Sequence, residues 1–205
     1  MCSLTRATLG RLPLYLNHVR QLQQQGESNT SATAIARALG MGEVQVRKDL
    51  SAISGAGKPK TGYLISDLMD ALEKALGHRQ KTRAFIVGAG KLGKALLSYD
   101  GFAEYGLEIV TAFDTDPHKA NTMENGKPIK PMDSLEAFLQ ETPAPIGILT
   151  GPPSAAQTVC DRLVACGIHA IWSFAPGHLQ VPDGVCVQHE NLALSLACLN
   201  GQRNA

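Results

Sequence analysis

Three glycines at the end of an apolar run constrain the fold of this chain more than any other feature. Gly88, Gly90 and Gly93 follow the apolar residues 85–87 with the spacing G-x-G-x-x-G, and a helix-like segment comes next. In such a strand–turn–helix, the first glycine permits the tight turn, the second lets a pyrophosphate approach the backbone, and the third lets the helix pack on the strand. The spacing predicts a dinucleotide site. Because glycines also mark ordinary turns, a purely structural turn is the alternative.

An acidic residue downstream supports the dinucleotide interpretation. Residues 110–113 have the pattern of a second strand, and Asp114 ends it, 24 residues after Gly90. A carboxylate roughly 20 residues beyond the glycines is expected to bind an adenosine ribose. No arginine stands near Asp114, so the carboxylate favours NAD over NADP by repelling a 2′-phosphate. The residues of the loop predicted to bind the cofactor are Gly88, Ala89, Gly90, Lys91, Leu92 and Gly93.

The remaining C-terminal sequence alternates apolar runs with helical segments. Residues 146–150 and 167–172 are strand-like, as is a final region over 181–187, and this alternation predicts an α/β fold with a Rossmann-like doubly wound parallel sheet. Ligands of such sheets bind at the carboxyl ends of the strands. We therefore expect the second half of the cofactor to meet Thr150, Pro152, Phe174, Ala175 and Pro176. A terminal helix from Asn191 has an apolar face that can pack on its own domain or on another copy.

Charge divides the chain into two parts. Residues 1–83 hold 12 Lys and Arg against 6 Asp and Glu, whereas residues 84–205 hold 7 against 12. A basic block before an acidic remainder suggests two domains, and the basic one is a candidate for binding a polyanion. With the boundary in the charged segment 78–83, the expected parts are a DNA-binding domain (1–80), an NAD(H)-binding domain (81–188) and a C-terminal dimerisation helix (189–205).

The basic block has the pattern of a winged helix-turn-helix. Residues 11–25 are helical with Pro13 in the first turn, after a frayed start. A short helix that holds residues 34–39, with N-cap candidates at 31–33, and a helix over 43–53 flank a glycine-containing turn. In the last helix Val44, Val46, Leu50 and Ile53 are the apolar positions, and its N-terminal part is expected to meet base edges. Residues 54–63 follow as the wing, with a flexible linker as the alternative. The predicted DNA-binding residues are Ser31, Gln45, Arg47, Lys48, Ser51, Lys58, Lys60 and Tyr63.

Several classes of protein are disfavoured by composition. No apolar run reaches the roughly 18 residues of a membrane span, and the N-terminus lacks a signal-peptide pattern, so a cytoplasmic location without a membrane partner is expected. The five cysteines are scattered without C-x-x-C spacing, which predicts neither a disulfide framework nor a metal site. Buried or idle thiols are expected, with a redox-reactive thiol as the alternative.

The order of these parts resembles the Rex family of redox-sensing transcriptional repressors, over about residues 11–199. The most specific matches are RLPLY at 11–15, QVRKDLS at 45–51 and the glycine loop (residues 88–93) running on to residue 102. FDTDP at 113–117 and FAP at 174–176 match as well. The resemblance implies a homodimer that binds palindromic operator DNA when NADH is low and is released when NADH binds. It also implies a C-terminal helix exchanged between subunits and nicotinamides close to residues 174–176.

The chain departs from the family pattern at several positions. Ile53-Ser54 and Ala56-Gly57 stand where relatives usually carry two Phe-Gly pairs. Asn191 and Asn17 replace an Asp and an Arg that some relatives pair. Tyr99 and Asn191 are the expected switch residues, joined by a hydrogen bond instead of a charge pair. Ser173 replaces a frequent Asn beside the nicotinamide, which affects the expected discrimination between NADH and NAD+.

An NAD-dependent oxidoreductase is the alternative function. It needs a proton donor or acceptor beside the nicotinamide and a substrate pocket. His169, His178 and His189 are the candidates, but none has an acidic partner by spacing, and no second domain is left to bind a substrate. We therefore expect no catalytic residue and no small-molecule substrate.

Overall fold

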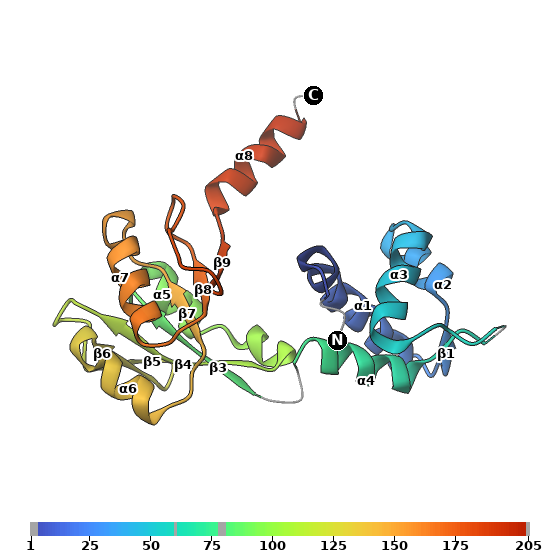
Figure 1. Cartoon of the computed structure of the whole chain (residues 1–205), viewed down its shortest axis with the longest axis horizontal. Helices are drawn as coiled ribbons and strands as arrows, with labels where there is room; N and C mark the ends of the chain where they lie inside the picture. The colour runs from blue at the N-terminus through green and yellow to red at the C-terminus, as the bar shows by residue number, and fades with distance from the viewer. Residues whose placement is uncertain (1–3, 60, 78–80, 204–205) are drawn as a thin grey trace. The chain divides into compact units, whose positions relative to one another are not determined.

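The computed structural model describes residues 4–59, 61–77 and 81–203 of the 205-residue chain. The chain divides into two compact units, Met1–Gln80 and Lys81–Ala205. Figure 1 shows the first unit in blue to blue-green and the second from green to red.

The described residues of the first unit form four helices and two short strands. They are α1 (Arg6–Gln24), β1 (Asn29–Thr30), α2 (Ala32–Leu39), α3 (Glu43–Ser54), β2 (Tyr63–Leu64) and α4 (Ile65–Ala75). In α1 the buried residues Leu12, Tyr15, Leu16 and Val19 recur at the spacing of one helical face. They pack against buried residues of the other three helices, among them Ile35, Val46, Leu50, Leu68 and Leu72.

The first helix is longer than expected. It begins at Arg6, where Thr5 caps it by accepting a hydrogen bond from the Thr8 amide at 3.1 Å, so the predicted frayed start is wrong. Pro13 consequently lies inside the helix instead of in its first turn. Proline has no N–H, which deprives the Leu9 carbonyl of its helical partner. Leu9 is exposed, so water can satisfy that carbonyl.

The helix-turn-helix is confirmed. Ser31 caps α2 by accepting a hydrogen bond from the Ala34 amide at 3.1 Å, and Gly40 ends α2 in the left-handed conformation at φ +64°. The helix α3 then begins after Gly42. One assignment within α3 is wrong: Val44 was expected to be an apolar core position, but its side chain is 68% exposed.

The wing is a hairpin and not a loose linker. Lys58 and Gly62 exchange backbone hydrogen bonds of 2.7 and 2.8 Å, and β1 pairs antiparallel with β2 below them. Gly62 has φ +70°, and a Cβ there would lie 2.2 Å from the Thr30 carbonyl oxygen, so only glycine fits. Lys60, which was expected to approach DNA, lies outside the described residues.

A seven-stranded sheet forms the centre of the second unit. Its strands are β3 (Thr82–Val87), β4 (Leu107–Asp114), β5 (Thr122–Glu124), β6 (Lys127–Pro131), β7 (Ile146–Leu149), β8 (Ala170–Ser173) and β9 (Cys186–His189). Their spatial order is β5-β6-β4-β3-β7-β8-β9, and every neighbouring pair is parallel except β5 and β6. The chain leaves the central strand β3 in one direction and later crosses back to the other side. This is the predicted Rossmann-like doubly wound topology.

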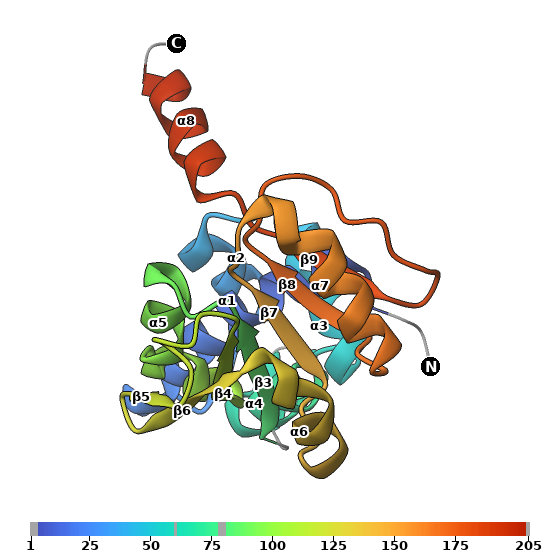
Figure 2. The same cartoon turned by 90° about the vertical axis from the view of Figure 1, so that its left-hand side faces the viewer.

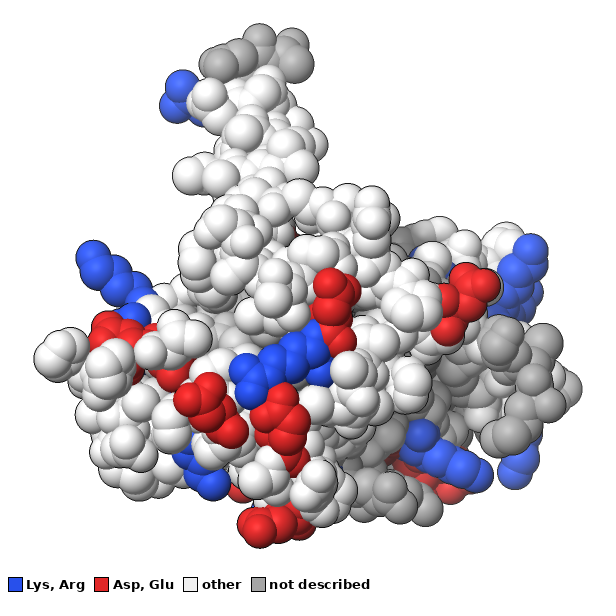
Figure 3. Space-filling view, turned by 60° about the vertical axis from the view of Figure 1, so that its left-hand side comes forward, with Lys and Arg blue, Asp and Glu red and all other residues white. Residues whose placement is uncertain are grey.

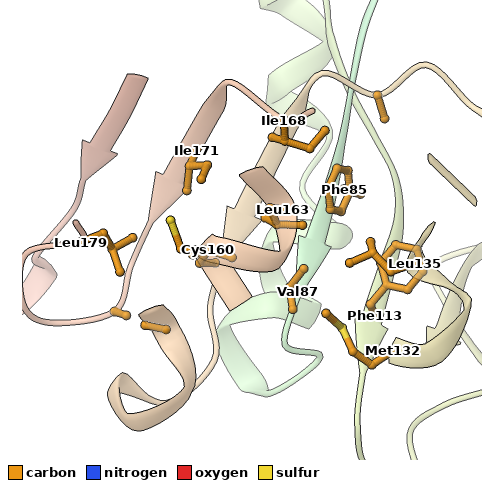
Figure 4. Packing of buried hydrophobic residues seen from close by; sticks show 14 residues of the cluster. Phe85, Val87, Phe113, Met132, Leu135, Cys160, Leu163, Ile168, Ile171 and Leu179 are labelled. Carbon is orange, nitrogen blue, oxygen red and sulfur yellow. The ribbon is translucent and has the colours of Figure 1, made fainter. Parts of the chain in front are cut away.

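Helices cover both faces of this sheet. They are α5 (Lys91–Leu97), α6 (Leu135–Glu141) and α7 (Pro153–Ala165), with 3-10 turns η1 (Asp100–Tyr105) and η2 (Met132–Ser134). Figure 2 shows α5 on one face and α6 and α7 on the other. Under α6 and α7 the rings of Phe85 and Phe113 meet edge to face, 5.9 Å apart, among buried Leu135 and Leu163 (Figure 4). This packing supports the strands whose ends form the site described below.

The C-terminal segment differs partly from expectation. The last strand begins only at Cys186, and residues 181–182 are not part of it, since Pro182 has no N–H for a sheet ladder. The terminal helix α8 (Leu192–Arg203) forms as predicted, and the Asn191 side chain caps it by accepting a hydrogen bond from the Leu194 amide at 2.9 Å. Every described residue of α8 is exposed, so within one chain its apolar side chains cover nothing.

Candidate functional site

A pocket of about 360 Å³ lies where β3, β4 and β7 end. We call it the strand-end pocket. Residues of all three strand ends and of the start of α7 line it: Val87, Gly88, Gly90, Phe113, Asp114, Thr115, Asp116, Lys119, Met132, Leu149, Thr150, Gly151, Pro152, Ala155, Ala156 and Val159. A mostly apolar cleft of this size with a few polar groups is typical of a small-molecule site. Five predicted cofactor residues, Gly88, Gly90, Asp114, Thr150 and Pro152, come together here.

The three glycines of the loop have different tasks. Gly88 has φ +107°, and a Cβ there would lie 2.7 Å from the Gly151 nitrogen. A Cβ on Gly93 would lie 2.0 Å from the Gly88 carbonyl oxygen, so this glycine lets α5 pack on the loop. Gly90 has φ −77°, and a Cβ there would meet no atom within 4 Å. Since the protein's own packing does not require glycine at position 90, the open space fits the close approach of a ligand.

Thr150 fastens the loop from the neighbouring strand end. Its hydroxyl donates to the Gly88 carbonyl at 2.6 Å, and its amide donates to the Val87 carbonyl at 3.0 Å. Thr150 was predicted to bind the cofactor directly; in the structure its hydroxyl also holds the shape of the loop. Ala89 is buried, and its amide donates to Asp114, so that amide is committed within the protein.

Asp114 is held in place by backbone amides. Its Oδ2 accepts from the Ala89 amide at 2.7 Å, and its Oδ1 accepts from the Asp116 amide at 2.8 Å. The Lys119 ammonium lies 3.4 Å from Asp114 Oδ2 and 3.5 Å from Asp116 Oδ2. Burial lowers the pKa of Lys119, but the two carboxylates outweigh it and hold that pKa above its ordinary value. Sequence reasoning missed Lys119; its position five residues after the strand-ending Asp was the available signal.

The other predicted cofactor residues lie outside the lining of this pocket. Lys91, Leu92 and Gly93 form the first turn of α5. Beyond β8, the Phe174 amide donates to the Leu149 carbonyl at 2.9 Å, so the segment after β8 is tied to the end of β7. Phe174 is half-buried, Ala175 is buried and Pro176 is exposed. These three residues therefore stand at the same carboxyl edge of the sheet, one strand further along.

Two side chains at that edge, Ser173 and the partly buried His189, have buried polar atoms without hydrogen-bond partners among the described residues. The Ser173 hydroxyl and both ring nitrogens of His189 make no hydrogen bond within the described part of the chain. Ser173 and His189 are register partners on β8 and β9, and the His178 ring stands 5.6 Å from the His189 ring. Among the described residues, neither ring nitrogen of His189 has an acidic hydrogen-bond partner of the kind that a general base needs.

In the first unit, α3, the start of α2 and the wing enclose a groove. Its lining includes the predicted residues Ser31, Arg47, Lys48, Ser51, Lys58 and Tyr63. Arg47 pairs with Glu43 one turn earlier, and the Ser51 hydroxyl donates to the Lys48 carbonyl at 3.0 Å. Tyr63 lines this groove but is buried, and its ring lies against Gly57, so it supports the wing from below.

Gln45 is also engaged differently from expectation. Its amide donates to Asp49 Oδ1 at 3.0 Å. Asp49 is buried, and it also accepts from the Arg11 guanidinium at 2.7 Å and the Tyr15 hydroxyl at 2.8 Å. Thr8 donates to the same carboxylate at 3.1 Å. This cluster joins α1 to the middle of α3 and thereby sets the orientation of the helix that carries Arg47.

The cluster shifts the ionisation of its members. Burial raises the pKa of the Asp49 carboxyl, but hydrogen bonds from Arg11, Tyr15, Gln45 and Thr8 outweigh it and hold the pKa below its ordinary value. Burial and the Asp49 carboxylate raise the pKa of Tyr15 to about 12. Both residues therefore keep their neutral-pH charge states over a wide pH range.

The described residues hold neither a metal cluster nor a membrane-spanning helix. No group of three or more His, Cys, Asp or Glu side chains there is placed to hold a metal ion. No helix in that part of the chain is long and apolar enough to span a bilayer.

The described cysteines differ in exposure. Cys160 is buried, and burial raises the pKa of its thiol, which disfavours the reactive thiolate. Cys186 and Cys198 are exposed.

Known proteins are similar to both parts of the chain. Residues 3–51 match the family described as "Putative DNA-binding protein N-terminus", and residues 79–177 match the family described as "CoA binding domain". The redox-sensing transcriptional repressor Rex of Bacteroides fragilis is 40% identical over 96% of this chain and 90% of its own length. The Rex of Treponema denticola is 42% identical over 95% and 92%.

Solved structures give the same answer over the full length. The chain is similar to RSP in complex with β-NAD+ and operator DNA, with a TM-score of 0.92 and 31% identity over 100% of this chain and 94% of that one. It is also similar to RSP in complex with β-NADH, with a TM-score of 0.85 and 30% identity over 100% and 96%. With relatives this similar over nearly their whole length, a winged helix-turn-helix and a glycine loop beside Asp114 on one chain, this protein belongs to the Rex family of redox-sensing transcriptional repressors.

Proposed function

We propose that this chain is an NADH-responsive transcriptional repressor, which binds palindromic operator DNA as a homodimer and is released when NADH binds. One observation carries the proposal. Gly90, which the protein's own packing does not require, faces open space beside Asp114, on the same chain as a helix-turn-helix. An input site and an output site on one chain are what a ligand-controlled repressor needs.

The strand-end pocket has the residues to bind the adenosine half of the cofactor. Asp114 would accept hydrogen bonds from the ribose hydroxyls, and the backbone at Gly90 would receive the pyrophosphate. Thr150 and Gly88 keep the loop in the shape that this contact needs, through their 2.6 Å hydrogen bond. When bound, the cofactor supplies the redox signal, because its nicotinamide ring is neutral in NADH and positive in NAD+.

Discrimination between the two forms is assigned to the segment after β8. Phe174 packs against Trp172, with ring centroids 4.5 Å apart, and Ala175 lies in the apolar core. An apolar surrounding penalises a positive ring by desolvation, so it favours NADH. The buried Ser173 hydroxyl, where relatives often have an Asn, lies beside this surface.

The dimer is assigned to α8. Its leucines Leu192, Leu194, Leu196 and Leu199 are each about 60% or more exposed, and the helix surface is almost free of charge (Figure 3). An apolar surface of this kind is typical of an interaction site. We propose that α8 is exchanged between subunits. Asn191 uses its Oδ1 to cap α8, and Tyr99, which is exposed, is the proposed partner for its amide group.

The oxidoreductase alternative has no support in the relatives, which are named transcriptional repressors. We accordingly place no substrate and no catalytic residue on this chain. Since the proposed partner is genomic DNA, a cytoplasmic location is part of the proposal.

A gel-shift assay on a palindromic A·T-rich operator tests the function, with NADH and NAD+ titrated separately. NADH is expected to release the DNA at concentrations at which NAD+ does not. Footprinting should show two half-sites about one helical turn apart, or a multiple of it. Equal responses to the two cofactors would contradict redox sensing, and protection of a single half-site would contradict the dimer.

A further inference from the structure

One face of α3 combines three polar residues with an exposed apolar one. Successive helical residues are about 100° apart, so Val44, Arg47, Lys48 and Ser51 fall on a single stripe. All four side chains are exposed, and Val44 is the one large apolar side chain that α3 exposes. We call these four residues the reading stripe.

Gln45 lies about 100° away from Val44 on the helix, outside the reading stripe. Its hydrogen bond to Asp49 directs the side chain toward the cluster that joins α3 to α1. The first-turn position of the reading stripe is therefore occupied by Val44, and not by the glutamine that hydrogen-bonding capacity alone would favour.

The fold gives no reason for valine at this position. Val44 is 68% exposed and contributes nothing to the core that the other apolar residues of α3 build. Valine is also a poorer helix former than alanine, because its β-branched side chain has one strongly preferred rotamer in a helix. An apolar side chain kept at this place points to an apolar contact with the partner of the helix.

That partner, on the proposed function, is the major groove of operator DNA. The N-terminal part of a recognition helix meets base edges there, and the apolar group exposed on those edges is the C5-methyl of thymine. We propose that Val44 reads the C5-methyl of a thymine in each operator half-site. Arg47 and Lys48, on the same stripe, bind an adjacent guanine or phosphate.

Deoxyuridine tests this contact because it differs from thymidine by the methyl group alone. An operator bound by the full-length protein in the gel-shift assay is remade with each thymine replaced singly by deoxyuridine. One position in each half-site should lose roughly 3- to 10-fold in wild-type affinity, the size expected for one buried methyl contact. In Val44→Ala, the same replacement should have no effect.

Leu14→Ala is the matched control. Leu14 is likewise an exposed apolar residue on a helix of the first unit, so its truncation should leave the wild-type deoxyuridine profile unchanged. The midpoint of thermal unfolding of Val44→Ala should be equal to that of wild type or slightly higher, because alanine is the better helix former. Two results would overturn the role of Val44 and leave the proposed function standing. In one, the protein binds the operator but no position is sensitive to deoxyuridine. In the other, Val44→Ala is as sensitive as wild type at the same position. Failure of wild type to bind any operator would overturn the proposed function, and this contact with it.

Discussion

Gly90 and Gly93 lie three positions apart in one loop, yet the structure predicts opposite effects for the same substitution. Gly90→Ala adds a Cβ that meets no protein atom but intrudes on the approach of the pyrophosphate. We expect unchanged thermal stability and NADH affinity reduced by about 10-fold or more, roughly 1.4 kcal/mol. Gly93→Ala forces a Cβ to within 2.0 Å of the Gly88 carbonyl oxygen and should destabilise the fold itself.

Thermal unfolding and NADH titration of the two variants separate these effects. If Gly90→Ala bound NADH with wild-type affinity, the pyrophosphate would not lie against position 90. If Gly93→Ala were as stable as wild type, the close packing of α5 on the loop would be misjudged.

Asp49 is expected to matter for stability more than any other charge of the first unit. Asp49→Ala removes the acceptor for four side chains and leaves Arg11 without its 2.7 Å ion pair. The loss should be on the order of 3 kcal/mol. Glu73→Ala is the control, since the Arg20–Glu73 pair is about 30% exposed and should contribute less than about 1 kcal/mol. Native-state hydrogen exchange of α1 and α3 in the full chain measures the loss of stability in both variants.

The same carboxylate predicts a pH dependence. The pKa of Asp49 in the folded protein lies below its ordinary value of about 3.9. Between the two values the unfolded chain binds more protons, so the stabilisation is complete above about pH 4 and is lost as the pH falls through the folded pKa. In wild type, the stability of α1 and α3 measured by native-state hydrogen exchange should therefore decrease as the pH is lowered below about 4. An equal fall in Asp49→Ala would assign the effect to other groups.

Four aromatic rings in the second unit form a row from η1, which carries the proposed switch residue, to the segment after β8, which carries the proposed nicotinamide surface. Tyr99 and Phe102, at η1, have ring centroids 5.0 Å apart; Phe102 and Trp172 are 6.0 Å apart; Trp172 and Phe174 are 4.5 Å apart. The row leads from the proposed nicotinamide surface at Phe174 to the exposed Tyr99, the proposed switch residue. Because close-packed interiors transmit strain, we expect a shift at one end of this row to displace the other end.

Phe102→Leu should therefore weaken the coupling between the sites. NADH and operator DNA should each bind with near wild-type affinity, while the reduction of operator affinity by saturating NADH shrinks several-fold. Phe138→Leu is the control, because Phe138 packs on Phe85 and Phe113 at the opposite face of the sheet. It should lower stability and leave the coupling intact. Full coupling in Phe102→Leu would show that the signal takes another route.

Because operator binding and NADH binding are assigned to different compact units, we expect that each can be weakened without the other. Arg47→Ala removes a charged group from the reading stripe and should weaken operator binding by about 1–3 kcal/mol, with NADH affinity unchanged. Asp114→Ala should weaken NADH binding and leave operator binding in place, which gives a repressor that responds poorly. Gel shifts and NADH titrations of both variants provide the measurement. Equal loss of both activities in either variant would indicate misfolding, and loss of DNA binding alone in Asp114→Ala would reverse the assigned roles.

Features that depend on short stretches of chain were predictable. The helix-turn-helix follows from helical spacing around a glycine turn, and the sheet follows from apolar runs that alternate with helices. The glycine turn after one strand and Asp114 at the end of the next were predicted correctly. Both depend only on residues that are close to them in the sequence. The start of α1 was missed because Pro13 suggested a first turn, whereas the Thr5 cap and tertiary packing extend the helix to Arg6.

The amino-acid order alone predicts the two kinds of domain, the glycine loop and the helix that carries Arg47 and Lys48. Tertiary structure decided which side chains of that helix face outward. Asp49 gathers Arg11 and Thr8 from 38 and 41 positions away, and by also taking Gln45 it leaves Val44 on the exposed stripe. The row of rings from Tyr99 to Phe174 was decided in the same way. Periodicity is a local property of the chain, but burial and pairing are set by residues that only folding brings together.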